Sequence, residues 1–184
     1  MTRLLALSGS LRAASLNTAL ARAAQQLAPE GVEIDVATLH GVPLYDGDLE
    51  AAEGMPAAVL ALQARIVAAD GLLLVTPEYN NGVPGVFKNG IDWLSRTGEK
   101  KLFAGRPTAL MGASPGGFGT LLSQTAWLAT LKSLGTPVYS GGRLLLSRAH
   151  TLIDAEGQLG DPAARRHVAE FVAGFVDFTR RSAG

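Results

Sequence analysis

The sequence of 184 residues contains no cysteine. This absence excludes disulfide bonds, thiolate nucleophiles and cysteine-ligated metal sites. The three histidines, His40, His150 and His167, are scattered along the chain without the spacing of a metal site. The sequence therefore offers neither a reactive thiol nor a recognisable metal centre.

A net charge is also lacking, because 16 Lys and Arg residues balance 16 Asp and Glu residues. A neutral chain gives no electrostatic reason to expect binding to nucleic acid or to an anionic membrane. No apolar run reaches the roughly 18 residues that a membrane span requires. Residues 1–12 are typical of a first strand and its turn rather than of a signal peptide. We therefore expect a cytoplasmic protein that binds neither nucleic acid nor membrane.

Apolar residues are abundant, at 47% of the chain against 17% charged residues. This balance is typical of a globular protein rather than a disordered one. The length suits one core, and no linker, repeat or low-complexity tract divides the chain. We predict a single domain over residues 1–184.

Hydrophobic periodicity predicts strands and helices in alternation. Strands are expected at 3–8, 32–39, 71–76, 107–113 and 137–140, and helices at 17–28, 56–69, 85–95, from about 120, and at 162–181. Residues 32–39 alternate between apolar and acidic, which indicates a half-exposed edge strand. The pattern predicts an α/β fold in which a doubly wound, five-stranded parallel sheet of order 2-1-3-4-5 lies between two helical layers.

Other segments give weaker expectations. Residues 40–54 and 141–161 are expected to be irregular, apart from a short β segment at 143–147. Helical spacing after Thr120 predicts a buried stripe formed by Leu121, Leu128, Leu131 and Leu134. Trp93 and Trp127 are expected in the core, with a subunit interface as the alternative. A solvated loop is expected for Lys100, Lys101 and Arg106.

Ligands of such folds bind beyond the carboxyl ends of the strands, so the turns there are the first candidates for a site. The first turn begins at Gly9, and the amides of the helix after it attract anions. The hydroxyls of Ser10 and Ser15 and the guanidinium of Arg12 are suited to phosphate oxygens, and Asn17 suits the helix cap. The turn matches neither a Walker loop nor the dinucleotide fingerprint. Phosphate binding and an ordinary strand–helix turn with a polar cap both remain open.

The second turn, residues 76–85, contains two prolines and two glycines. These residues stiffen the loop and allow its backbone to approach a ligand closely. Tyr79 then offers a flat edge to a planar ring. The alternative is a proline-stiffened loop in which Tyr79 packs in the core.

The third turn, residues 112–119, is rich in glycine and also matches the GxSxG pattern of hydrolases, with Ser114, Asp154 and His167 in hydrolase order. In that mechanism the residue after the serine donates its amide to the oxyanion. Here that residue is Pro115, which has no N–H, and the loss of such a donor costs roughly 3 kcal/mol. His167 also falls within a predicted helix. We therefore favour a ligand-binding turn over a hydrolase.

Taken together, these turns resemble those of the NADPH-dependent FMN reductase family, with its quinone and chromate reductase relatives. The resemblance covers residues 3 to about 140. It is carried by Gly9-Ser10-Leu11-Arg12 with Ser15 and Asn17, by Pro43-Leu44-Tyr45-Asp46, by Thr76-Pro77-Glu78-Tyr79-Asn80, and by Val83-Pro84-Gly85 followed by Lys88 to Arg96.

The resemblance implies a flavodoxin-like fold, FMN as cofactor and NADPH or NADH as electron donor. It implies a ping-pong hydride mechanism on the flavin, with no catalytic side chain and with a quinone, azo, chromate or flavin acceptor. It also implies a homodimer or homotetramer with the flavin near the interface. The alternative is a flavodoxin-like electron carrier without substrate turnover, although such carriers are usually strongly acidic and this chain is neutral.

By the same resemblance, the cofactor-binding residues fall in three groups, one for each turn. The phosphate would be held by Ser10, Arg12, Ser15, Leu16 and Asn17. The isoalloxazine ring would be lined, mainly through backbone, by Pro77, Glu78, Tyr79 and Asn80. Its pyrimidine end would be bordered by Ser114, Gly116, Gly117 and Gly119.

Overall fold

The computed structural model describes residues 1–96, 98 and 102–182. Its strands are β1 (Thr2–Ser8), β2 (Val32–Ala37), β3 (Gly71–Val75), β4 (Thr108–Ala113) and β5 (Leu144–Leu146). Its helices are α1 (Leu16–Gln26), α2 (Gly47–Glu53), α3 (Ala57–Val67), α4 (Gly85–Ser95), α5 (Leu121–Ser133) and α6 (Pro162–Ser182), with a short 3-10 helix, η1, at Ala149–Thr151.

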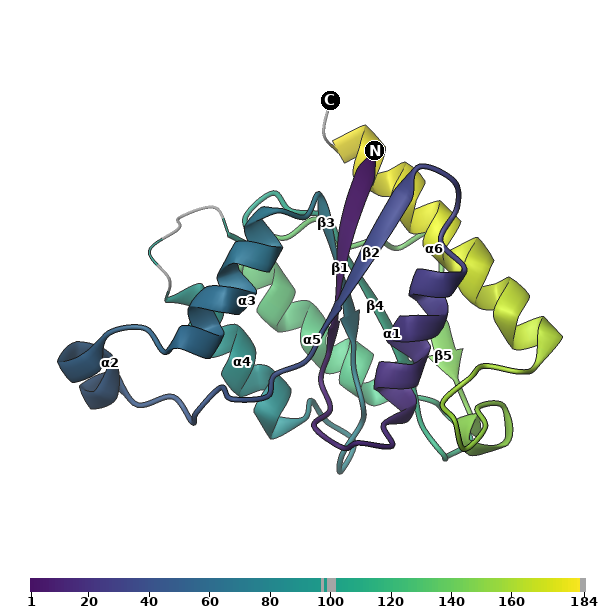
Figure 1. Ribbon diagram of the computed structural model, residues 1–184, viewed down its shortest axis with the longest axis horizontal. Helices are drawn as coiled ribbons and strands as arrows, with labels where there is room; N and C mark the ends of the chain where they lie inside the picture. The colour runs from purple at the N-terminus through teal and green to yellow at the C-terminus, as the bar shows by residue number, and fades with distance from the viewer. Residues whose placement is uncertain (97, 99–101, 183–184) are drawn as a thin grey trace.

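The five strands form one parallel sheet in the order β2-β1-β3-β4-β5, which confirms the predicted order and the flavodoxin-like fold. Helices α1 and α6 cover one face of this sheet, and α3, α4 and α5 cover the other (Figure 1). A central strand buried on both faces must be apolar throughout, and β3 (GLLLV) is fully buried. Figure 1 also shows the N-terminus and the end of α6 at the amino ends of the strands.

The two faces of the sheet carry separate hydrophobic clusters. Successive residues of β1 alternate between them, with Leu4 and Ala6 on the side of α1 and α6 and Leu5 and Leu7 on the other. Both tryptophans are fully buried in the second cluster, so their placement in the core is confirmed.

The fifth strand is not where the sequence pattern put it. Residues 137–140 form no strand, since Val138 makes only an isolated parallel bridge to Thr108. Pairing resumes at Leu144–Leu146, within the short β segment that was expected at 143–147. The interruption has two physical causes: Gly141 and Gly142 weaken an extended segment, and the ring of Tyr139 is drawn against phenylalanines of α6.

The loop expected at 40–54 contains α2, which begins after Asp46. The Asp46 carboxylate accepts a hydrogen bond from the amide of Asp48 at 2.9 Å, the usual chemistry of a helix N-cap. None of the residues of α2 is buried, and Figure 1 shows the helix projecting away from the layers. A helix with no buried residue leaves no apolar periodicity in the sequence, which is why the pattern missed it.

The buried face of α5 also differs from the predicted stripe of leucines. Among its buried residues are Ser123, Trp127 and Leu131, whereas Leu128 is 43% exposed. The hydroxyl of Thr76 favours this rotation of the helix. Its oxygen lies 2.8 Å from Ser123 Oγ and accepts a hydrogen bond from Trp127 Nε1 at 3.1 Å. A buried polar network therefore sets the rotation of the helix instead of the leucine periodicity.

Two further findings concern the basic loop and the edge of the sheet. Lys100 and Lys101 lie outside the described residues, but Arg106 is half-buried and donates to the carbonyls of Leu102 and Ala69. Burial lowers the pKa of its guanidinium. The expectation that Arg106 lies in a solvated loop is therefore wrong for its side chain. No helix within the described ranges is long and apolar enough to cross a membrane.

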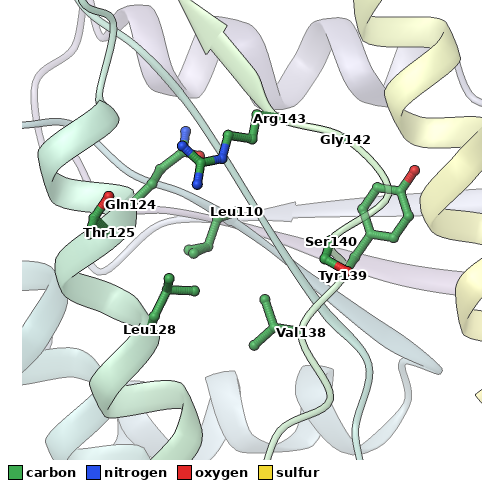
Figure 2. A pocket seen from close by; sticks show the side chains of 9 residues that line it. All are labelled: Leu110, Gln124, Thr125, Leu128, Val138, Tyr139, Ser140, Gly142 and Arg143. Carbon is green, nitrogen blue, oxygen red and sulfur yellow. The ribbon is translucent and has the colours of Figure 1, made fainter.

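A cleft of about 190 Å³ lies beside α5, where the interrupted strand leaves the sheet edge uncovered. Figure 2 shows that Leu110, Leu128 and Val138 line it together with Gln124 and Arg143. None of the predicted cofactor-binding residues lines this cleft.

Candidate active site

Three turns follow β1, β3 and β4, which are neighbours in the sheet, and Figure 1 shows them together at its carboxyl end. Backbone hydrogen bonds carry the sheet into the turns: Gly9 N donates to Val75 O at 2.9 Å and Thr76 N to Met111 O at 2.8 Å. The starts of these turns, where a crevice was predicted, are therefore fixed to the sheet by backbone hydrogen bonds.

The first turn ends at α1, whose N-cap is Ser15 rather than Asn17. Ser15 Oγ accepts a hydrogen bond from Thr18 N at 3.1 Å. The side chain of Asn17 instead exchanges two hydrogen bonds with the backbone of Ala113, at 2.8 and 2.9 Å. Asn17 thus fixes α1 to the end of β4, and only its backbone amide is left for a ligand.

Two amides at the start of α1, those of Leu16 and Asn17, make no hydrogen bond within the described part of the chain. They point outward along the helix axis, as first-turn amides do. Helix α1 carries no acidic residue in its first turn. An anion would therefore meet unengaged donors and no like charge on the helix itself.

Two further donors lie on the same turn. Ser10 is 4% exposed, and its Oγ accepts only a weak hydrogen bond from Arg12 N at 3.4 Å, which leaves its hydroxyl proton available. The Arg12 side chain is exposed and has no hydrogen bond or ion pair to any described residue. His40 Nε2 lies 3.1 Å from Leu11 O and holds the turn against the loop after β2.

The second turn is a tight β-hairpin at Tyr79–Gly82. Tyr79 N donates to Gly82 O at 3.3 Å and Gly82 N to Tyr79 O at 3.0 Å. Asn80 and Asn81 between them have φ values of 50° and 61°, the left-handed pair of a type I′ turn. Tyr79 is 51% exposed, so it does not pack in the core.

Glu78 has a structural partner that the sequence did not indicate. Its Oε2 accepts hydrogen bonds from the amides of Leu122 and Ser123, at 2.8 and 2.9 Å. Thr120, the N-cap of α5, makes no side-chain cap bond, so the Glu78 carboxylate caps that helix from another turn. The Glu78 side chain is therefore engaged within the fold, whereas its backbone amide makes no hydrogen bond to a described residue.

The third turn is held at both ends and free between them. Gly116 O accepts a hydrogen bond from Arg148 N, and Ser114 O accepts one from Ala149 N, each at 2.9 Å. At the other end Gly119 has φ 61° and lies so close to Leu145 that a Cβ would come within 3.0 Å of it. Between these anchors, a Cβ on Gly117 would meet nothing within 4 Å.

The glycines of the three turns thus have different structural roles. A Cβ at Gly9 would come within 2.1 Å of the Phe87 ring, and one at Gly112 within 2.3 Å of Thr76 O. These two positions need glycine for packing. Gly117, by contrast, borders open space, where the backbone is accessible to a ligand.

The hydrolase arrangement is not assembled. Pro115 follows Ser114 and offers no amide to an oxyanion. His167 is an exposed residue of α6, and Asp154 Oδ1 accepts a hydrogen bond from Gln158 N at 2.7 Å. In the residues that the structure describes, no hydrogen bond joins the serine, histidine and aspartate of the sequence pattern.

The donors present fit a phosphorylated planar cofactor such as FMN. The first turn offers the Leu16 and Asn17 amides, the Ser10 hydroxyl and the Arg12 guanidinium, which together suit a phosphate dianion. The other turns add backbone amides that make no hydrogen bond to described residues, among them those of Glu78, Asn80 and Gly117.

The comparison with known families agrees with this geometry. The family model of the NADPH-dependent FMN reductases matches residues 2–151, which include all three turns. The chain belongs to the NADPH-dependent FMN reductase family. It is therefore an oxidoreductase of a family that uses FMN and NAD(P)H.

Individual members of the family are similar over nearly the whole chain. An NAD(P)H-dependent FMN reductase of Pseudomonas aeruginosa is 40% identical over 182 residues, which is 99% of this chain and 97% of the relative. A 2-hydroxy-1,4-benzoquinone reductase of a Burkholderia species is 34% identical, over 94% of this chain and 93% of the relative. The solved structure of FerB, a flavoenzyme NAD(P)H:acceptor oxidoreductase of Paracoccus denitrificans, superposes with a TM-score of 0.87 at 33% identity and 99% coverage of both chains.

Sequence reasoning missed two residues at the third turn, Phe118 within it and Arg148, which is bonded to it. Phe118 is 81% exposed on the third turn, and Arg148 adopts a left-handed conformation with φ 48° beside it. Phe118 could have been singled out from the sequence, because a large aromatic residue flanked by glycines is unusual in a turn expected to bind a ligand. Arg148 was not, because its place beside Gly116 depends on the fifth strand, which the pattern misplaced.

Proposed function

We propose that the chain is an FMN-dependent NAD(P)H oxidoreductase that reduces a quinone-type acceptor by a ping-pong mechanism. The observation that carries the proposal is the unengaged N-terminus of α1, with Ser10 and Arg12 beside it, in a turn whose other polar side chains are already bonded. The quinone as acceptor is supported by the relative that is named for 2-hydroxy-1,4-benzoquinone.

The first turn is assigned to the phosphate. The amides of Leu16 and Asn17, the hydroxyls of Ser10 and Ser15 and the guanidinium of Arg12 would supply its hydrogen bonds. Ser15 has a double role, because its Oγ already accepts from Thr18 N and keeps only its proton for the ligand. Arg12 is the only charged group among these and would provide the largest share of the attraction.

The other two turns are assigned to the ring. Backbone of Pro77, Glu78 and Asn80 would line one edge, with the exposed Tyr79 beside it. Ser114, Gly116, Gly117 and Gly119 would border the pyrimidine end. Within the third turn the Ser114 hydroxyl accepts from Gly116 N at 3.2 Å, so the loop is braced without using its outward amides.

FMN, when bound, supplies two-electron chemistry between the nicotinamide and the acceptor. The residues of this chain hold and orient the cofactor, and their amides favour negative charge on its ring. No nucleophile or general base is assigned, because the proton that the acceptor needs is available from water at an open crevice.

An electron carrier of the flavodoxin kind is the second candidate class. It would share the fold and cofactor but require a charged docking surface for a partner protein. The balanced charge of the chain favours the enzyme.

We also propose a homodimer or homotetramer. The outer side of α5 supports this, because Leu122 and Leu128 are both exposed on it, at 45% and 43%. A subunit contact there would remove these two side chains from water. A monomer in light scattering at micromolar concentration would contradict this part of the proposal.

The test is the colour of the purified protein followed by rapid mixing with NADPH. We expect a yellow protein that releases FMN on heating, and bleaching of the flavin absorbance on mixing, followed by recovery when a quinone is added. A colourless protein that does not bind added FMN contradicts the cofactor site. Bound flavin that stays oxidised with both NADPH and NADH contradicts the reductase and leaves the electron carrier.

A further inference from the structure

We propose that the acceptor is a planar quinone that carries a negative charge, with Phe118 stacking on its ring and Arg148 pairing with its anionic group. This inference rests on the proposed function, because it places the acceptor at the turn assigned to the flavin ring. It adds the charge of the substrate and two residues that select it.

Phe118 is the first observation. Its side chain is 81% exposed, although a phenylalanine gains stability when it leaves water. The turn cannot fold it inward, because Gly116 is bonded to Arg148 on one side and Gly119 lies against Leu145 on the other. The ring is therefore held at the surface by a fixed backbone, which suits a contact that forms only with a ligand.

A hydrogen bond joins the second turn to the start of the helix that follows the third turn. Glu78 Oε2 bonds the amide of Leu122, which follows Phe118 by four residues, and Tyr79 is adjacent to Glu78. The two exposed aromatic rings therefore stand on neighbouring turns that a hydrogen bond ties together. Exposed aromatic side chains on neighbouring turns suit a planar, apolar ligand.

Arg148 is the second observation. Its backbone is left-handed, with φ 48° and ψ 36°, a conformation that an arginine adopts only when its surroundings impose it. Two backbone contacts impose it here: its N donates to Gly116 O, and its O accepts from Thr151 N, each at 2.9 Å. The residue is thus fixed to the third turn.

The guanidinium of Arg148 is uncompensated. It is exposed, and it makes no hydrogen bond or ion pair with any residue that the structure describes. A free cation whose backbone is bonded to the turn that carries an exposed ring is matched by a ligand with a planar ring and an anionic substituent. Arg12, the other free cation of the crevice, is already assigned to the FMN phosphate.

The reaction balances without a further reagent. NAD(P)H supplies a hydride, equivalent to two electrons and one proton, and water supplies the second proton. The quinone becomes a hydroquinone, NAD(P)H becomes NAD(P)⁺, and the anionic substituent keeps its charge throughout. Arg148 therefore contributes to binding and orientation and takes no part in proton transfer.

The experiment compares two acceptors that share a ring, 1,4-naphthoquinone and its 2-sulfonate. The readout is the ratio of kcat/KM for the sulfonate to kcat/KM for the neutral quinone, with NADPH saturating. For Arg148→Gln we expect this ratio to fall about tenfold, the loss of one charge-assisted contact at an exposed site. Arg148→Lys should recover part of the ratio, because the charge remains but the forked geometry is lost.

Phe118→Ala should lower kcat/KM for both quinones about fivefold and leave their ratio unchanged, since stacking does not depend on the charge. Phe118→Tyr should behave like the natural protein. The matched control is Arg143→Gln, which removes another exposed and unpaired arginine that lines the cleft beside α5 rather than the crevice.

Several outcomes overturn the inference. An unchanged ratio in Arg148→Gln shows that Arg148 does not recognise the negative charge of the acceptor. A raised KM for NADPH in this variant assigns Arg148 to the electron donor instead. A Phe118→Ala protein with altered oligomeric state and unaltered kcat/KM makes the ring a subunit contact. FMN content and melting temperature identify a variant that has not folded. In that case Arg148→Lys and Phe118→Tyr are used to test the inference. If NADPH does not reduce the flavin of the natural protein, the proposed function fails first.

Discussion

The two ends of the sheet treat their charged side chains differently. At the amino end, arginines have partners: Arg65 forms a forked pair with Asp35 at 2.6 and 2.7 Å, and Arg106 donates to two carbonyls. Arg3 lies 3.7 Å from Glu33, and Arg180 donates to a threonine hydroxyl. These four side chains already have partners within the fold.

At the carboxyl end two arginines are unpaired in the part of the chain that the structure describes. Arg12 and Arg148 have no side-chain partner among the described residues, and the first amides of α1 are also unbonded. Folded proteins satisfy most of their polar groups internally. Where one end of a sheet satisfies them and the other end does not, the second end is the place where a ligand completes the set. This contrast can be tested with paired substitutions, one at each end.

The largest difference between the two ends is expected when one glycine at each end is replaced by alanine. Gly112→Ala, at the carboxyl end of β4, places a Cβ within 2.3 Å of Thr76 O, a backbone atom that cannot move alone. We expect it to lower the free energy of unfolding by about 3 kcal/mol, and the melting temperature by roughly 10 °C, and to abolish FMN retention.

Gly71→Ala, at the amino end of β3, is the matched change. Its Cβ would meet only side-chain atoms, of Thr179, Leu4 and Phe175, at 3.0 to 3.1 Å. A loss of about 1 kcal/mol with normal FMN binding is expected. Thermal melting and FMN content of both variants provide the measurement, and a Gly71→Ala protein that loses FMN would show that the two ends are not independent.

The second contrast separates binding from stability. Arg12→Ala should raise the Kd for FMN roughly 30-fold, or about 2 kcal/mol, and leave the melting temperature of the flavin-free protein unchanged. Arg65→Met should do the opposite, lowering stability by about 1 kcal/mol with no change in Kd. Fluorescence titration with FMN and thermal melting test both. The contrast fails if Arg12→Ala destabilises the flavin-free protein.

The strands of the sheet and the roles of side chains at the turns were not equally predictable from the sequence. The buried strands, the strand order and the three turns were predictable because local composition determines them: a run such as GLLLV suits only a central strand. The location of the crevice follows from the strand order alone.

Side-chain roles at the turns were less predictable because they depend on partners far away in the chain. Asn17 bonds Ala113 at a separation of 96 residues, and Glu78 bonds Leu122 at a separation of 44. No local pattern distinguishes these from an ordinary cap or loop residue. The fifth strand was misplaced for a similar reason, since Tyr139 is drawn toward α6 by rings more than thirty residues later.

Glu78 connects stability and binding within the carboxyl end. Glu78→Ala removes the acceptor of two amides at the start of α5, and we expect a loss of about 1.5 kcal/mol and a several-fold rise in the Kd for FMN as the second turn shifts. Glu78→Gln keeps a carbonyl acceptor and should recover at least half of both effects. Chemical unfolding and FMN titration measure them. An alanine variant with normal stability would mean that the cap contributes nothing.

The smallest effect is expected at the amino end and depends on pH. The hydrogen bonds from Arg65 lower the pKa of Asp35 below its ordinary value of 3.8, and burial opposes this only in part. Because the folded state holds the proton more weakly than the unfolded state, the stabilisation is complete above about pH 5 and is lost as the pH falls through the lowered pKa. Both side chains are partly exposed, so the contribution is under about 1 kcal/mol.

Urea unfolding of the natural protein and of Asp35→Asn at about pH 6 and about pH 3 tests this. The variant should be less stable by that small amount at the higher pH, with the difference shrinking at the lower pH as the natural Asp35 takes up its proton. Adding salt to about 1 M should also reduce the difference at the higher pH, because the pair is open to screening. A difference that stays constant with pH would show that Asp35 stabilises the fold through its shape and hydrogen bonds rather than its charge.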